Sequence, residues 1–199
     1  QSIFSKNGMN IVEYTAENGI LTCDYVHKPL LEDVILKASE ERNVSEIYRL
    51  MDLLYEEILH SSEQIAWKDN ILYTLDIGIE ENENLYGPIL KLGFLDMNFR
   101  NAFYCDGELL WFDQEWVLEA VPAKFILYHA LIVLYFSYPR FCSFEEVTDR
   151  YGMQDSIDAF QKFQKLFEQL ALDDAQIIME NAFRVDGRAD YIPNIKKLL

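Results

Sequence analysis

The dipeptide Asp106-Gly107 constrains the fold of this chain more than any other feature of the sequence. Short apolar runs flank it, from Ala102 to Cys105 and from Glu108 to Phe112. An Asp-Gly pair between two strand-like runs is the strongest short-range signal for a β-hairpin with a tight turn of the primed type. The sequence therefore predicts a hairpin over residues 102–112.

Polar side chains lie at both ends of this predicted hairpin. Asp96 and Asn101 precede it in a polar loop, and Asp113 and Glu115 follow it directly. Because a hairpin folds the chain back on itself, we expect the second pair to lie near the first. A carboxylate can accept a proton, and carboxylate and amide oxygens are hard ligands that suit Mg²⁺. The pattern thus indicates a site for proton transfer and for a cation.

This order of loop, hairpin and acidic residue resembles the protein-kinase-like fold, in its branch of aminoglycoside phosphotransferases and choline kinases. In that family an Asp-x4-Asn loop precedes a hairpin that ends in a metal-binding Asp. The resemblance implies that Asp96 is the catalytic residue and that Asn101 and Asp113 bind Mg²⁺. It also implies Glu115 as a metal ligand, because choline kinase-like members often carry Asp-x-Glu where protein kinases carry Asp-Phe-Gly. Leu95 departs from the family, which usually has a His or Asn-type residue before the loop Asp.

The same residues have a purely structural interpretation. Asp96, Asn98 and Asn101 are typical of loops in which side chains bond to the local backbone, and Asp113 can cap the segment that follows it. Taken singly, each residue fits this role better than a functional one. The kinase-like interpretation is favoured by the whole set together with the hairpin.

A second hairpin is predicted over residues 11–26, with two apolar runs around Asn18-Gly19. In kinase-like proteins a hairpin of this kind leads into the hinge between the two lobes. By that resemblance the hinge falls on residues 23–26, where Asp24 and Val26 bind the adenine of ATP through a backbone carbonyl and a backbone amide. The alternative is an ordinary edge hairpin followed by a helix.

Most of the remaining chain has helical periodicity. Apolar residues from Ile47 to Ile58 recur at steps of three and four, and either Asn43 or Ser45 can cap the start of that helix. One further helix is predicted after Pro29, and a buried helix is predicted with Pro122 in its first turn. The capping-box pair Ser143 and Glu146 predicts the start of another helix. A last helix is predicted from the helical spacing of an apolar stripe, which consists of Ile157, Phe160, Phe163, Phe167 and Leu170. The predicted fold class is α+β, dominated by helices.

The resemblance divides the chain into two predicted parts. Residues 1–28 would be a hairpin and hinge remaining from a small lobe, and residues 29–199 a mainly helical large lobe that carries the hairpin at 102–112. The residues before the hinge are too few for the usual small lobe with its phosphate-binding Lys. The chain is therefore either the larger lobe of a longer protein, as its start at Gln1 suggests, or a reduced member of the family. In both cases we expect it to be inactive by itself, because a cleft with one wall cannot exclude water.

The formal net charge of −17 restricts the partners. It disfavours nucleic-acid backbones and anionic membrane surfaces, and a bound nucleotide would need a metal ion to offset the field. The cysteines Cys23, Cys105 and Cys142 lie far apart, as in proteins of a reducing compartment, so we expect a cytoplasmic location. No apolar run is long enough to span a bilayer.

The predicted function is a kinase-like module that uses ATP and Mg²⁺, with a small molecule or sugar as the phosphate acceptor. The segments FDQEW (112–116) and PAKFILYHAL (122–131) also resemble parts of bacterial cell-surface polysaccharide proteins. That resemblance implies that the partners are other domains of the same polypeptide. The alternative is a non-catalytic kinase-like interaction module attached to a methyltransferase or glycosyltransferase. A third possibility is an acidic helical domain with another role.

Overall fold

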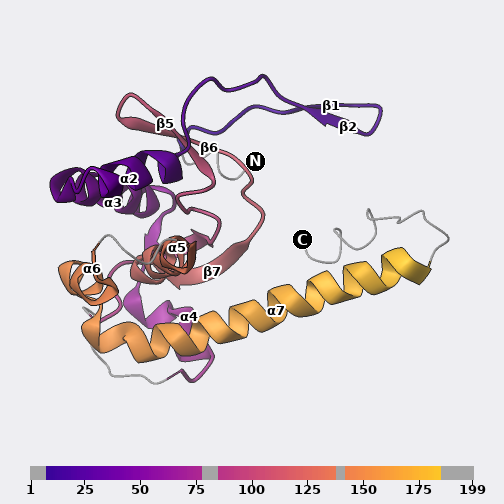
Figure 1. Ribbon diagram of the computed structural model, residues 1–199. Helices are drawn as coiled ribbons and strands as arrows, with labels where there is room; N and C mark the ends of the chain where they lie inside the picture. Colours follow the sequence, from indigo (N-terminus) through magenta and orange to yellow (C-terminus); the bar gives the residue numbers. More distant parts are fainter. Residues whose placement is uncertain (1–7, 78–84, 138–141, 185–199) are drawn as a thin grey trace. The chain divides into compact units, whose positions relative to one another are not determined.

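The computed structural model describes residues 8–77, 85–137 and 142–184, which form a mixed α+β fold, as predicted (Figure 1). The chain divides into two compact units, residues 1–159 and residues 160–199. The described N-terminal residues belong to the first unit, together with all the strands. The assignment of residues 1–28 and 29–199 to two kinase lobes stays a prediction.

Both predicted hairpins are present. They consist of β1 (Thr15–Glu17) with β2 (Ile20–Thr22), and of β5 (Ala102–Cys105) with β6 (Glu108–Trp111). The turn residues Asn18 and Gly19 have φ angles of 51° and 78°, and Asp106 and Gly107 have 54° and 109°. Two successive positive φ angles are what a type I′ turn requires, so the local sequence alone specifies both turns.

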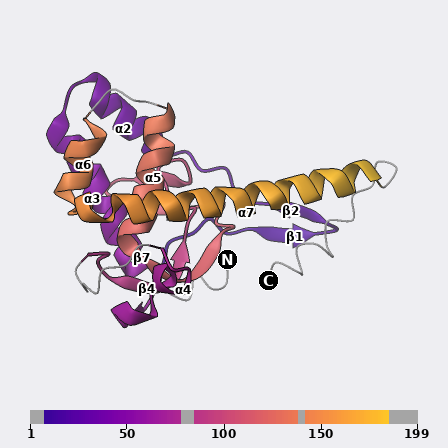
Figure 2. The same cartoon turned by 90° about the horizontal axis from the view of Figure 1, so that it is seen from below.

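The two hairpins differ in their burial. All six residues of β1 and β2 are exposed, and Figures 1 and 2 show this hairpin extending away from the rest of the first unit. Leu109 and Trp111 of β6 are buried. The indole Nε1 of Trp111 donates a hydrogen bond to Glu57 Oε2 at 3.2 Å, which ties β6 to helix α3 (Val44–His60). The second hairpin is therefore part of the core.

A three-stranded antiparallel sheet, which the sequence did not predict, supports the polar loop. Its central strand is β4 (Ile89–Phe94), which lies between β3 (Gln64–Ile65) and β7 (Val117–Pro122). In the pairing of β4 with β7, Ile89 lies opposite Pro122 and Phe94 opposite Val117. The polar loop begins where β4 ends, and β7 begins just after Glu115. The pairing of β4 with β7 therefore brings together the chain segments that lie just before and just after the predicted site.

The remaining elements are helices. They are α2 (Leu31–Glu40), α3, the 3-10 turn η1 (Trp67–Asp69), α4 (Ile71–Thr74), α5 (Ala123–Ser137), α6 (Phe144–Arg150), the 3-10 turn η2 (Gln154–Ser156) and α7 (Ile157–Arg184). The capping box of Ser143 and Glu146 is formed as predicted. Pro122 is the last residue of β7, so its predicted place in the first turn of α5 is wrong. Because β7 is an edge strand, a residue without an N–H group is tolerated there.

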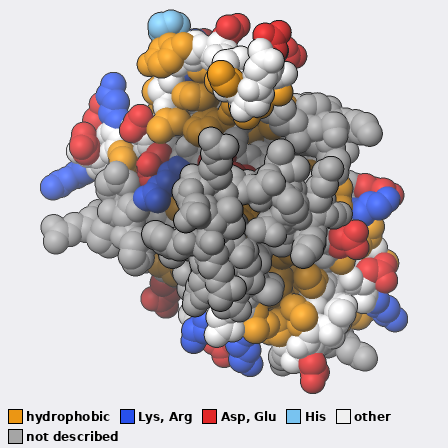
Figure 3. Space-filling view, turned by 90° about the vertical axis from the view of Figure 1, so that its right-hand side faces the viewer, with side chains coloured by type: hydrophobic (Ala, Val, Ile, Leu, Met, Phe, Trp, Pro, Cys, Tyr) orange, Lys and Arg blue, Asp and Glu red, His pale blue; other side chains and the backbone are white. Residues whose placement is uncertain are grey.

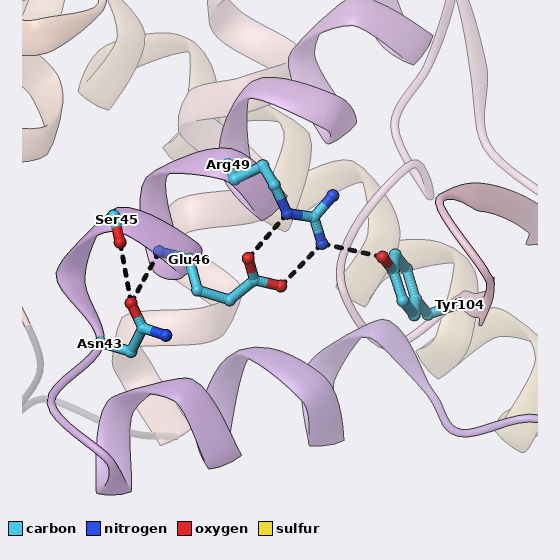
Figure 4. Close-up of polar contacts among 5 residues, drawn as sticks. All are labelled: Asn43, Ser45, Glu46, Arg49 and Tyr104. Carbon is cyan, nitrogen blue, oxygen red and sulfur yellow. Dashed lines mark hydrogen bonds and ion pairs between the residues drawn. The ribbon is translucent and has the colours of Figure 1, made fainter.

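Helix α3 is tied to the second hairpin by a polar cluster (Figure 4). Asn43 caps the helix, because its Oδ1 accepts from the Glu46 amide at 3.2 Å and from the Ser45 hydroxyl at 2.9 Å. The Arg49 guanidinium donates to both Glu46 carboxylate oxygens at 2.7 Å and to the Tyr104 hydroxyl at 2.8 Å. The hydrogen bonds from Arg49 lower the pKa of Glu46. Arg49 thus joins α3 to β5, as the Trp111–Glu57 bond joins α3 to β6.

We predict that Gly93→Ala weakens the sheet under the polar loop. A Cβ atom at this position would lie 2.6 Å from the Val121 Cβ atom on β7, which is backbone-attached and cannot move aside alone. Overpacking of this kind costs about 1–3 kcal/mol in the free energy of unfolding, measurable by urea denaturation. Lys91→Ala, an exposed position on the same strand, is the control and should change stability by less than about 0.5 kcal/mol. Equal effects of the two substitutions would contradict the prediction.

Candidate functional site

Asp96 lies at the centre of the predicted site and is half-buried. Its Oδ2 atom accepts hydrogen bonds from the backbone amides of Glu115 and Trp116, both at 2.7 Å. The Leu95 amide donates to the Trp116 carbonyl at 3.0 Å, which continues the pairing of β4 and β7 into the loop. The Asp96 carboxylate therefore has the structural role that the sequence left open, and the structure brings it next to Glu115.

Asn101 belongs to the same cluster. Its Nδ2 donates to the backbone carbonyl of Asp96 at 3.1 Å. The backbone carbonyl of Asn101 accepts from the Phe112 amide at 3.0 Å. Asn98 makes the local bond expected of a loop residue, from the Arg100 amide to its Oδ1 at 2.9 Å. No hydrogen bond to the Asn101 Oδ1 atom comes from the described residues, so this oxygen can accept from a ligand.

Three carboxylates interact electrostatically in this site. Burial raises the pKa of Asp96, and the negative charge of Asp113 raises it further, against the lowering effect of the Trp116 and Glu115 amides and of His129. Burial also raises the pKa of Glu115, as do the charges of Asp113 and Asp96. Asp113 and Glu115 are both exposed. Asp96, Asp113 and Glu115 therefore repel one another, and a bound cation would relieve that repulsion.

The donor set suits a magnesium ion. Carboxylates and an amide oxygen are hard ligands, and Mg²⁺ usually keeps several waters while one or two carboxylates bind it. Within the described part of the chain, no three His, Cys, Asp or Glu side chains converge on one point as metal ligands. The assignment of Asn101, Asp113 and Glu115 as metal ligands therefore stays a prediction.

A cavity of about 430 Å³ lies against the second hairpin. The predicted hinge residues Asp24 and Val26 line it, and so do Phe103 and Phe112, whose ring centroids are 4.8 Å apart. The other residues that line it are Val12, Tyr14, Cys23, Tyr25, Lys28, Pro29, Leu30 and Asp33. The cavity therefore has one wall from the N-terminal segment and one from the hairpin.

Backbone bonds hold these two walls together. The Val12 amide donates to the Trp111 carbonyl at 2.8 Å, and the Tyr104 amide donates to the Pro29 carbonyl at 2.9 Å. The segments before and after the β1–β2 hairpin are thus fixed to β6 and β5, respectively. This arrangement brings the predicted hinge over the hairpin that leads to Asp113.

The cavity and the carboxylates are neighbours. Phe112 lines the cavity and is followed directly by Asp113. Burial raises the pKa of Tyr14, and the charges of Cys23 and Asp113 raise it further, so the Tyr14 hydroxyl lies within electrostatic range of both. Sequence reasoning missed Tyr14, Phe103 and Phe112. The position of Phe112 before Asp113 is a signal that was available, whereas nothing local in the sequence connects Tyr14 with Asp113.

A larger cavity of about 570 Å³ lies along α3, and none of the predicted site residues lines it. Both of its basic groups are already paired, Arg150 with Asp52 inside the cavity and Arg49 with Glu46. Arg150 donates to Asp52 at 2.6 Å and lies over the Tyr48 ring at 4.7 Å from its centroid. The smaller cavity is the better candidate, because it combines an aromatic surface with the neighbouring carboxylates.

Comparison of the chain with protein-family models, with curated proteins and with solved structures found no match. The kinase-like resemblance therefore depends on the residues of the site alone. None of the helices in the described ranges is both long enough and apolar enough to cross a membrane.

We predict that Asp96 makes stability depend on pH with a defined sign. Folding raises the pKa of Asp96, so its contribution to the free energy of unfolding is fully present below its pKa in the unfolded chain, near 3.8. This contribution is lost as the pH rises through the pKa that Asp96 has in the folded protein. The wild-type protein should therefore gain stability relative to Asp96→Asn as the pH is lowered from about 7 to about 4. Denaturant unfolding at several pH values measures this difference.

Asp69→Asn is the matched control, because it removes the same charge from an exposed turn. Its stability relative to the wild type should vary less with pH. The assignment to Asp96 would be wrong if both variants gave the same pH dependence.

Proposed function

We propose that this chain is a kinase-like module that binds a nucleotide with Mg²⁺ in the cavity beside the β5–β6 hairpin. One observation carries the proposal. The predicted adenine-binding residues Asp24 and Val26 line the cavity together with Phe112, which directly precedes the predicted metal ligand Asp113 in the chain. Phe112 and Asp113 thus join the cavity to the predicted metal ligands.

The cavity suits the base of a nucleotide. Its volume is within the range of about 300–1,000 Å³ that is usual for small-molecule sites. Phe103 and Phe112 offer an aromatic surface to a flat ring. In the proposed complex the Asp24 carbonyl and the Val26 amide bond to the edge of the base and fix its orientation.

The oxygen ligands next to the cavity suit the phosphates and their cation. Asp113 and Asn101 would hold Mg²⁺, with Glu115 as a further ligand. When bound, the ion neutralises phosphate charge in a protein whose net charge is −17. The strongly acidic chain needs such an ion more than most proteins do, because like charges repel the nucleotide.

Asp96 has one oxygen left for chemistry. Its Oδ2 is used by two backbone amides, whereas no described residue donates to its Oδ1. In a phosphoryl transfer the acceptor hydroxyl attacks the γ-phosphorus, the bond to the ADP oxygen breaks, and the hydroxyl proton passes to Asp96 Oδ1. The acceptor would be a small molecule or a sugar, in a cytoplasmic module of a bacterial polysaccharide protein.

The second candidate is a non-catalytic interaction module attached to a methyltransferase or glycosyltransferase. The exposed β1–β2 hairpin favours it, because Ile20 and Leu21 are each 64% exposed and are available for contact with another domain. The structural role of the Asp96 carboxylate favours it as well. Under this proposal the cavity either binds a nucleotide without phosphoryl transfer or binds no nucleotide.

The expectation that nucleic acid is not a partner rests on the net charge of the sequence, which is −17. Among the side chains that are coloured by type in Figure 3, Lys and Arg are interspersed with Asp and Glu, and these coloured side chains form no single basic area. A nucleic-acid backbone would need such an area to offset a net charge of −17.

We predict that ATP stabilises the protein only with Mg²⁺, and that Asp113→Asn abolishes the effect. At a ligand concentration of about 100 times Kd, binding adds about 2.7 kcal/mol to stability. For a chain of this size each kcal/mol raises Tm by about 2–4 °C, which differential scanning fluorimetry detects. Asp113 has a φ of 53°, and Asn tolerates this conformation as well as Asp does.

Asp76→Asn is the matched control, because it removes one charge from another exposed Asp with a φ of 54° that lies outside the cavity. It should keep the Mg²⁺-dependent shift. A wild-type protein without any shift, or an equal loss in both variants, would count against the proposed site.

We also predict that MgATP protects Cys23 from alkylation. Cys23 is exposed and lines the cavity, so a bound base would cover its thiol. The rate of iodoacetamide labelling at Cys23, followed by mass spectrometry, should fall in proportion to occupancy. Cys105 and Cys142 are internal controls whose rates should stay constant, since neither lines the cavity. Unchanged labelling of Cys23 at saturating MgATP would exclude this cavity as the binding site.

A further inference from the structure

Gln114 is a residue of the site to which neither the sequence nor the proposed function gives a role. Its Nε2 atom donates to the Asp96 carbonyl at 3.0 Å and to the Phe112 carbonyl at 3.1 Å. Its Oε1 atom is buried and has no hydrogen-bond partner among the described residues. The side chain therefore points into the protein, between two neighbours, Asp113 and Glu115, that are exposed.

The two bonds from Gln114 connect the parts of the site. The Asp96 carbonyl accepts from both Gln114 and Asn101, so one oxygen fixes both amide side chains. The second bond goes to Phe112, which lines the cavity. Gln114 thus links the predicted catalytic loop with the cavity, and it lies in the chain between the two exposed carboxylates of Asp113 and Glu115.

The burial of the Gln114 Oε1 atom without a partner among the described residues indicates that the amide group does more than fill space. A buried acceptor without a partner costs about 1–3 kcal/mol. A Met side chain has a similar length and would fill the same space without that cost. The amide of Gln114 is understandable if its N–H groups hold the turn. That turn includes Asp113 in a left-handed conformation with a φ of 53°.

We propose that Gln114 is the positioning residue of the cation site: it orients the carboxylates of Asp113 and Glu115 relative to Asp96 and so sets the affinity for a divalent ion. The inference rests on the proposed function in that it takes Mg²⁺, or Mn²⁺ in its place, as the ligand. Gln114 acts through its neighbours and does not bind the ion itself.

Titration of the full chain with Mn²⁺, followed by electron paramagnetic resonance, tests this inference, with Tm measured in parallel. Gln114→Met should weaken Mn²⁺ binding about 10-fold, as outer-shell substitutions at metal sites typically do, while Tm changes by less than about 4 °C, because removal of the unpaired acceptor offsets much of the loss of two hydrogen bonds. Gln64→Met, at an exposed position of β3, is the control and should change neither quantity. Unchanged Mn²⁺ affinity in Gln114→Met would overturn the positioning role and leave the proposed cation site intact.

Gln114→Glu gives a second test that does not depend on how Met is accommodated. An ionised carboxylate cannot donate to the two carbonyls, so positioning predicts weaker Mn²⁺ binding in spite of the added negative charge. A role as a direct ligand predicts tighter binding, and that result would overturn the inference. Gln64→Glu adds the same charge elsewhere and should bind as the wild type does. Absence of Mn²⁺ binding in the wild type and in every variant would instead refute the proposed cation site, and this inference with it.

Discussion

The hydrogen bonds from the Glu115 and Trp116 amides to the Asp96 carboxylate are the interaction on which the candidate site depends. They lie just beyond the paired ends of β4 and β7 and hold the polar loop against the turn that follows the hairpin. The polar loop, the hairpin and this turn therefore form one closed loop of the chain. Hydrogen bonds to an ionised acceptor are about twice as strong as those between neutral groups. Because Asp96 is half-buried, losing these bonds would leave a charge in a poorly solvated place. The structural and functional interpretations of Asp96 are therefore compatible, since each uses a different oxygen.

Electrostatic repulsion in this closed loop gives the site its chemical character. Asp96, Asp113 and Glu115 are held within range of one another in a chain that is already strongly acidic. Folding has to overcome this repulsion, and a cation would relieve it. The neighbouring cavity, with its two phenylalanine rings, adds a surface of opposite character. An apolar surface for a flat ring beside carboxylate and amide oxygens is the combination that a nucleotide with its cation requires, which is why we propose this ligand and not a simple cation.

The elements that could be predicted from the sequence are those with a local cause. Asn18-Gly19 and Asp106-Gly107 specify their turns because few other residues adopt two successive positive φ angles. The caps at Asn43 and Ser143 are likewise set by side chains within three residues of the amides they bond. Pro122 misled the prediction, because a proline before a helix and a proline that ends an edge strand have the same local sequence. The sheet around β4 was missed, since its strands pair across segments that are far apart in the chain.

The sequence by itself thus determined the mixed α+β fold class and the two hairpins, and it predicted the acidic residues of the candidate site. Only the tertiary structure decided which of these residues meet. It placed the predicted hinge segment beside the second hairpin, brought Tyr14 within electrostatic range of Asp113, and turned Gln114 inward between two exposed carboxylates. The reason is physical: a turn depends on the backbone preferences of two adjacent residues, whereas a cavity depends on long-range pairing and packing that no local pattern encodes.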